Sequence, residues 1–157
     1  MKTRSIDRVR VSADELSLDI NILEMPASTR TAEEAASACG CTVSRIVKSL
    51  IFQRRDGDGL VLLLIAGDNQ ADLDLAGRVI GAPLERADAK RVREETGFAI
   101  GGVAPIGHLN APEIYIDPDL LEHDVVWAAA GAPNAVFSVD PAKLAEATGA
   151  RALVEPG

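Results

Sequence analysis

The run Leu60-Val61-Leu62-Leu63-Leu64-Ile65-Ala66 is the stretch around which we expect this chain to fold. A short, continuous apolar run of this kind is typical of a strand that is buried on both faces of a sheet. The preceding Asp56-Gly57-Asp58-Gly59 is a hairpin-type turn, and residues 45–54 before it have the composition of a strand. The pattern therefore predicts two paired strands, joined by a tight turn, at the centre of a sheet.

Further strands and helices alternate on both sides of this pair. A capping box starts a helix at Thr31, which Gly40 ends, and acidic caps start three more helices at Asp72, Asp88 and Asp140. Several strands are joined by tight turns, which favours an α/β fold of the α+β type with a mixed sheet. A period-two pattern predicts one strand over residues 16–22, after a short helix. The other strands are predicted at residues 83–86, 113–117, 125–130, 135–139 and 152–154.

Composition limits the classes of function. The chain has 157 residues and no linker or repeat, so we predict a single domain over residues 1–157. A net charge of −8 argues against broad nucleic-acid binding, and we expect no DNA partner. Because no apolar run could span a membrane and no signal peptide starts the chain, we expect a cytoplasmic protein without a membrane partner. Cys39, Cys41 and two distant histidines do not form a zinc pattern, so we predict neither a metal nor a cofactor.

The second informative stretch is Thr96-Gly97-Phe98-Ala99-Ile100-Gly101-Gly102-Val103-Ala104-Pro105-Ile106-Gly107-His108, which we call the glycine loop. Its four glycines and one proline do not suit the interior of a helix or a strand. Glycine is used where a ligand or another segment must approach the main chain closely. The alternatives are a structural turn and a loop whose N–H groups receive an oxyanion, a phosphate or a carbonyl. The length of the loop favours binding.

Lys48 is the most unusual side chain, because it lies within the apolar run Ile46-Val47-Lys48-Ser49-Leu50-Ile51-Phe52. A buried ammonium must reach solvent, pair with an acid or bind an anion. An edge-strand lysine or one that extends to the surface is the alternative. His108 is interpreted as a residue at the rim of a site, and His123 as part of a solvated turn. No nucleophile elbow, Walker loop or metalloprotease motif is present.

Four stretches, in this order, resemble the YbaK-type aminoacyl-tRNA deacylases, which are related to the editing domain of bacterial prolyl-tRNA synthetases. They are Thr31-Ala32-Glu33-Glu34-Ala35-Ala36, Ile46-Val47-Lys48-Ser49-Leu50, the glycine loop, and Ala130-Gly131. The resemblance implies a strongly twisted mixed sheet, partly barrel-like and surrounded by helices. It also implies hydrolysis of the ester between a wrong amino acid and the terminal adenosine of tRNA. The implied partner is the acceptor end of a mischarged tRNA, and a synthetase partner is left open.

The resemblance also assigns roles to residues. Lys48 would hold a phosphate or the terminal ribose, and the main chain at Gly101 and Gly102 would hold the aminoacyl carbonyl. An activated ester needs no side-chain nucleophile, so a water positioned by a ribose hydroxyl could attack it. The residues predicted to bind substrate are Thr31, Val103, Pro105, His108, Ala129, Gly131 and Asn134.

Two departures leave the amino acid open. Ala129 lacks a hydroxyl that relatives removing cysteine carry, and Thr31 stands where some relatives have an aromatic residue. Two other functions therefore stay under consideration. One is a non-catalytic module that binds an aminoacyl-like ligand or a translation partner, and the other is a hydrolase of small esters or amides.

Overall fold

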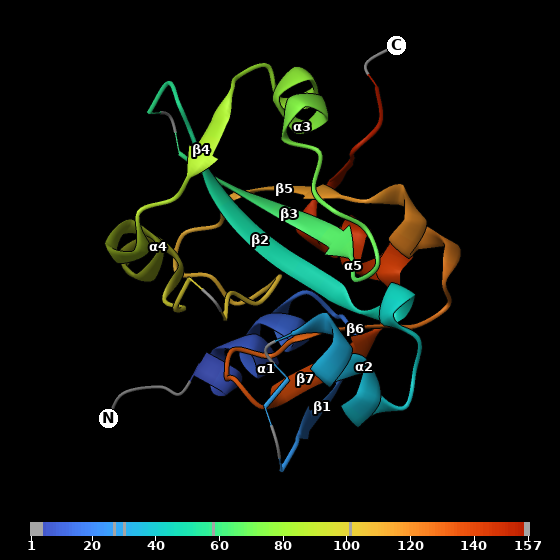
Figure 1. Ribbon diagram of the computed structural model, residues 1–157. Coiled ribbons are helices and arrows are strands. Elements are labelled where there is room, and N and C mark those ends of the chain that lie inside the picture. The colour runs from blue at the N-terminus through green and yellow to red at the C-terminus, as the bar shows by residue number, and fades with distance from the viewer. Residues whose placement is uncertain (1–4, 27, 30, 58, 101, 156–157) are drawn as a thin grey trace.

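The computed structural model describes residues 5–26, 28–29, 31–57, 59–100 and 102–155, which form a mixed α+β fold with two sheets. The larger sheet has the order β4(Leu84–Arg86), β2(Val47–Arg54), β3(Leu60–Ala66), β5(Glu113–Ile116), β8(Arg151–Ala152), and the smaller sheet the order β1(Asn21–Glu24), β7(Ala135–Val139), β6(Val126–Ala129). In the larger sheet β2 pairs antiparallel with β3 and β4, whereas β3, β5 and β8 are parallel neighbours (Figure 1). In the smaller sheet β7 pairs antiparallel with β1 and β6.

The predicted mixed sheet is confirmed, but its partly barrel-like closure is not. Among the described residues, the two sheets are linked by one isolated parallel bridge, between Ile46 and Trp127. Beyond this bridge β2 and β6 form no ladder among the described residues, and both strands line a cavity. The chain therefore forms two sheets that meet at one corner.

Strand β3 is buried along its whole length, as predicted, and it separates two apolar clusters. Leu62 and Leu64 point to the side that carries α1(Ser5–Glu15), the smaller sheet and part of the glycine loop. Leu63 and Ile65 point to the opposite side, where α3(Leu73–Ile80) lies. Because side chains alternate along a strand, one apolar run supplies both cores.

The predicted helix caps are also confirmed. Thr31 makes a capping box with Glu34, and Gly40 ends the helix in the left-handed conformation. Asp72, Asp88 and Asp140 each accept hydrogen bonds from main-chain N–H groups in the first turn of a helix. The helical elements are α1(Ser5–Glu15), α2(Ala32–Cys39), η1(Val43–Arg45), α3(Leu73–Ile80), α4(Ala89–Thr96), η2(Pro118–Glu122) and α5(Pro141–Thr148).

The strand predicted over residues 16–22 is wrong in its first half. The Leu18 N–H donates a hydrogen bond to the Ala13 carbonyl, and Ser17 has a φ of 54°. These residues therefore close the C-terminal end of α1, and β1 begins only at Asn21. Leu18 is buried as expected for an inward-facing residue, but it is buried as part of a helix terminus.

No helix among the described residues is long and apolar enough to cross a membrane.

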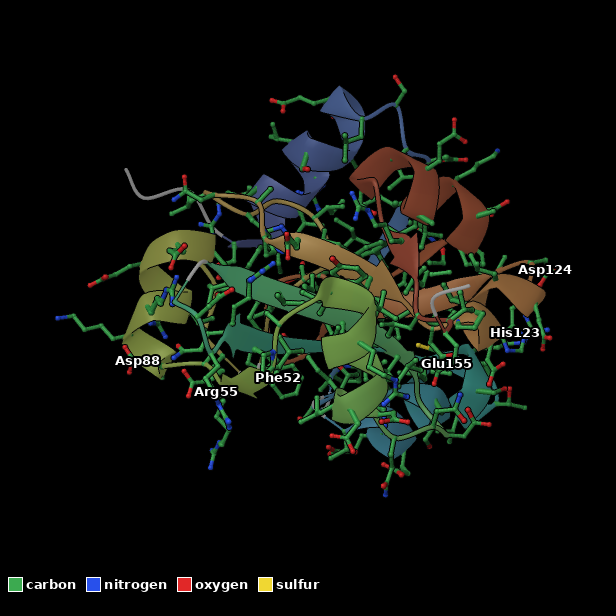
Figure 2. All side chains as sticks on the ribbon, turned by 90° about the horizontal axis from the view of Figure 1, so that it is seen from above. Phe52, Arg55, Asp88, His123, Asp124 and Glu155 are labelled. Carbon is green, nitrogen blue, oxygen red and sulfur yellow. The ribbon has the colours of Figure 1, made fainter. Side chains whose placement is uncertain are left out.

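Figure 2 shows α3 lying across the larger sheet. His123 and Asp124 lie at one edge of the molecule, and Arg55 and Asp88 lie towards the other.

Candidate active site

A cavity of about 280 Å³ lies where the two sheets meet. Its walls come from the start of α2, the first residues of β2, the glycine loop, β6 and the turn that follows β6. The cavity is lined by Thr29, Thr31, Ala32, Ala35, Ile46, Val47, Lys48, Ser49, Leu50, Ile100, Gly102, Val103, Trp127, Ala128, Ala129, Ala132, Pro133 and Val136.

The pairing of β2 explains why this strand can form a wall. Its partner β4 pairs only with residues 52–54, so among the described residues the first half of that edge of β2 has no neighbouring strand in the larger sheet. Strand β6 approaches this free edge and bridges it once, at Ile46. The unpaired part of the edge, residues 47–50, lines the cavity.

Lys48 is held by a neutral acceptor. Its ammonium donates a hydrogen bond to the main-chain carbonyl of Asn69, in the loop after β3. No ion pair in the described part of the chain includes Lys48. The ammonium therefore lies beside the loop after β3, which does not line the cavity, on the face of β2 that also carries Leu50. An ammonium without an acidic partner suits an anionic group of a ligand.

Asn69 is itself fixed by two acidic side chains. Its side-chain nitrogen donates hydrogen bonds to Asp117, at 2.9 Å, and to Asp119, at 2.7 Å. Asp117 is buried and also accepts a hydrogen bond from the Ala66 N–H, at 3.1 Å. The carbonyl that holds Lys48 thus belongs to a loop anchored to the ends of β3 and β5.

The glycine loop reaches the cavity through Ile100, Gly102 and Val103. The Gly102 N–H donates a hydrogen bond to the Ala99 carbonyl, at 2.8 Å, and so closes a turn. This N–H is therefore engaged within the loop in this conformation, and its role as an oxyanion donor stays a prediction. Gly101, the other predicted glycine, lies outside the described residues.

Two further residues of the loop, Pro105 and His108, do not line the cavity. Pro105 is buried. His108 Nε2 lies 2.6 Å from the Ala104 carbonyl, and since a carbonyl only accepts, this nitrogen carries the proton. Burial lowers the pKa of His108, and the positive charge of Arg8 lowers it further, against the opposing effect of the Ala104 hydrogen bond. His108 is therefore an internal contact of the loop.

Gly131 and Asn134 also lie outside the cavity lining. A Cβ atom at Gly131 would stand 3.0 Å from the Phe98 ring and 3.1 Å from Ser5, so this glycine permits close packing. The Asn134 side chain donates to the Met25 carbonyl, at 2.9 Å, and the Met25 N–H donates to the Asn134 carbonyl, at 2.7 Å. Asn134 thus joins the turn after β6 to the end of β1.

Of the other predicted residues, Thr31, Val103 and Ala129 line the cavity together with Lys48 and Gly102. Thr31 and Ala129 contribute to a wall that is mostly apolar. Sequence reasoning missed Ser49 and Trp127 as wall residues. The Ser49 hydroxyl is buried and has no hydrogen-bond partner among the described residues. Trp127, the only tryptophan in the sequence, was detectable as an unusual residue in a predicted strand.

Comparisons with known proteins show the family of this chain. Residues 26–147 match the family model of the aminoacyl-tRNA editing domain. The crystal structure of a candidate trans-editing enzyme for prolyl tRNA synthetase superposes with a TM-score of 0.89 and 44% identity, covering 99% of this chain and 98% of that one.

Two relatives extend the comparison. The proline–tRNA ligase of Thermosipho africanus is 35% identical over 81 residues, which are 51% of this chain and only 14% of that longer protein. EbsC of Enterococcus faecalis, a candidate Cys-tRNA(Pro)/Cys-tRNA(Cys) deacylase, is 27% identical over 127 residues, covering 75% of this chain and 77% of EbsC. This chain belongs to the family of aminoacyl-tRNA editing domains.

Proposed function

We propose that this protein hydrolyses the ester bond of mischarged aminoacyl-tRNA, as a trans-acting editing deacylase. The observation that carries the proposal is that Lys48, Gly102 and Val103 line one cavity although they come from a strand and a distant loop. Membership of the editing family and the similarity to a candidate trans-editing enzyme support the same activity.

The mechanism relies on orientation. Lys48 exchanges its Asn69 carbonyl partner for a phosphate, an anion that a cation without a carboxylate partner favours, or for the ribose region of the terminal adenosine. The aminoacyl carbonyl lies against the main chain at Gly101 and Gly102. Because the Gly102 N–H is engaged with Ala99, it assists only if the turn opens. Water held by the substrate's own ribose hydroxyl attacks the ester.

The walls restrict the amino acid that fits. Ala32, Ala35, Ala128, Ala129 and Ala132 make much of the surface apolar. Burying a second charge there without a partner is costly, so an uncharged side chain is favoured over a charged one. Ser49 is the one buried hydroxyl without a partner among the described residues, and it offers a hydrogen bond to a polar substrate group.

A binding module without catalysis is the second candidate. Its support is the missing hydroxyl at Ala129 and the net charge of −8, which makes tRNA binding depend on a local site or on a partner synthetase. The two candidates predict different behaviour for the same ligand, because only the deacylase releases the amino acid.

The test is a panel of mischarged tRNAs, with loss of the ester measured under single-turnover conditions. Lys48→Met keeps the apolar stem and removes the charge, and it should reduce deacylation by at least about tenfold. Lys90→Met is the matched control, because Lys90 is exposed on α4 and its contact with Glu94 is a long surface ion pair of 3.9 Å. Binding of aminoacyl-tRNA without any hydrolysis across the panel would favour the module.

A further inference from the structure

Helix α1 holds the start of the glycine loop through Arg8. One terminal nitrogen of the guanidinium donates a hydrogen bond to the Gly97 carbonyl, at 2.5 Å. The same group lies over the Phe98 ring, with its central carbon 4.9 Å from the ring centre. One arginine therefore contacts two consecutive residues at the point where α4 ends and the loop begins.

The far end of the loop meets the same helix. Gly107 has a φ of +86°, and a Cβ atom there would stand 3.1 Å from the Val9 nitrogen and 3.2 Å from the Arg8 carbonyl. The next residue, His108, contacts the start of the loop, because its ring packs edge-on against Phe98 with 5.7 Å between the ring centres. Both ends of the loop are thus fixed to one turn of α1.

The cavity-lining part of the loop lies between these two attachments. Ile100, Gly102 and Val103 all fall between Phe98 and Gly107. Their position relative to Lys48 therefore depends on how the loop ends sit on α1. This helix precedes the segment that matches the editing-domain model, which begins at residue 26.

We propose that Arg8 is a positioning residue for the reaction, which fixes the glycine loop so that its middle part forms the wall of the cavity. The inference rests on the proposed deacylation. A guanidinium suits this role because it is planar and can donate to a carbonyl while it stacks on a ring. The Arg8 Nε has no hydrogen-bond partner among the described residues, and beyond its own helix the printed hydrogen bond of the guanidinium is the one to Gly97, at the start of the loop.

The experiment compares Arg8→Met with Arg10→Met in the full chain. Arg10 lies on the same helix, is exposed, and pairs only with Asp7 at 3.1 Å among the described residues. Arg8→Lys is the second variant, because it keeps the charge and the stem but loses the planar group. Three quantities are measured for each: the single-turnover rate constant, the KM for aminoacyl-tRNA, and the amide hydrogen exchange of residues 97–108.

For Arg8→Met we expect a rate constant lowered about 10- to 100-fold, a KM within about threefold of wild type, and faster exchange in the loop alone. Arg8→Lys should recover part of the rate, and Arg10→Met should match wild type. The proposal would be overturned if amide hydrogen exchange in the loop were the same in folded Arg8→Met as in wild type. It would also be overturned if the single-turnover rate constant fell only in proportion to the fraction of protein that is folded. If wild type cleaves no aminoacyl-tRNA, the deacylase function fails, and hydrogen exchange alone still decides whether Arg8 fixes the loop.

Discussion

The side-chain amide of Asn69 donates a hydrogen bond to the buried carboxylate of Asp117, at 2.9 Å. A second bond from the same nitrogen reaches Asp119, at 2.7 Å. One uncharged amide therefore bridges the side chains of Asp117 and Asp119 at the end of the larger sheet. Its own main-chain carbonyl accepts the hydrogen bond from Lys48. The stability of this loop and the position of the candidate site cation are thus linked through Asn69.

Replacing Asn69 with aspartate should destabilise the fold. The change is nearly isosteric, but it removes both donors and adds a third carboxylate beside Asp117 and Asp119. We expect a loss of about 1–3 kcal/mol in the free energy of unfolding, measured by urea denaturation. Part of the loss should be recovered at high salt, which screens like charges. Asn110→Asp adds the same charge at an exposed position and serves as control; equal stability of the two variants would contradict the prediction.

His108 should make the stability of the fold depend on pH. Burial lowers its pKa below the ordinary value of 6.5, so the unfolded chain binds a proton more readily than the folded one. The contribution of His108 to stability is therefore fully present above pH 6.5 and is lost as the pH falls through the lowered pKa of the folded state.

The measurement is a series of urea denaturation curves at decreasing pH. The decline in unfolding free energy below pH 6.5 should be smaller in His108→Gln, whose amide can still donate to the Ala104 carbonyl. His123→Gln is the comparison variant, since His123 lies at the edge of the molecule (Figure 2). The same decline in all three proteins would mean that other groups cause it.

How much of this structure the sequence could predict depends on how local the determining contacts are. The caps at Asp72 and Asp88 were predictable, because each needs only its own side chain and the next three residues. The buried run of β3 was predictable from composition alone. Residues 16–20 were not, because leucines at even spacing also suit a helix end, and Ser17 adopts a positive φ there.

The candidate site was predictable in part for the same reason. The resemblance named Lys48 and the glycine loop, and the structure brings Lys48, Gly102 and Val103 to one cavity. A glycine, however, indicates only that another group lies close to the main chain. It does not indicate whether that group is a substrate or another part of the protein. Gly131 was assigned to a substrate pocket, yet the atoms beside it belong to Phe98 and Ser5. Such contacts join segments far apart in the chain, and no periodic pattern records them.

Neither Cys39 nor Cys41 should take part in the reaction. Burial and the neighbouring Cys41 raise the pKa of the Cys39 thiol to about 11, and burial also raises the pKa of Cys41. Compared with a thiol at 9.0, Cys39 then has about 100-fold less thiolate at neutral pH. Iodoacetamide should modify Cys39 slowly at pH 7, and the double Cys→Ser variant should deacylate within a few-fold of wild type. Rapid inactivation by the reagent at pH 7 would point to a reactive thiol.

Gly102 provides the sharpest test of whether the glycine loop meets the substrate. A Cβ atom at this position would have only the Ala99 carbonyl within 4 Å among the described residues, at 3.9 Å, and Gly102 does not have a positive φ. The fold therefore accommodates alanine at residue 102, and Gly102→Ala should unfold at a urea midpoint close to that of wild type.

If the ester lies against the loop, the added methyl group of Gly102→Ala will occupy space that the substrate needs, and single-turnover deacylation should fall about 10- to 1,000-fold.

Gly107→Ala is the matched contrast, because its Cβ would press on the backbone of α1 and it has a φ of +86°. That variant should lose stability first, with slower turnover following from the displaced loop. Because the Gly102 N–H already donates to the Ala99 carbonyl and alanine keeps this N–H, we expect a slower Gly102→Ala enzyme to report lost space and not a lost donor. A Gly102→Ala protein that is as stable and as active as wild type would show that the substrate does not approach this part of the loop.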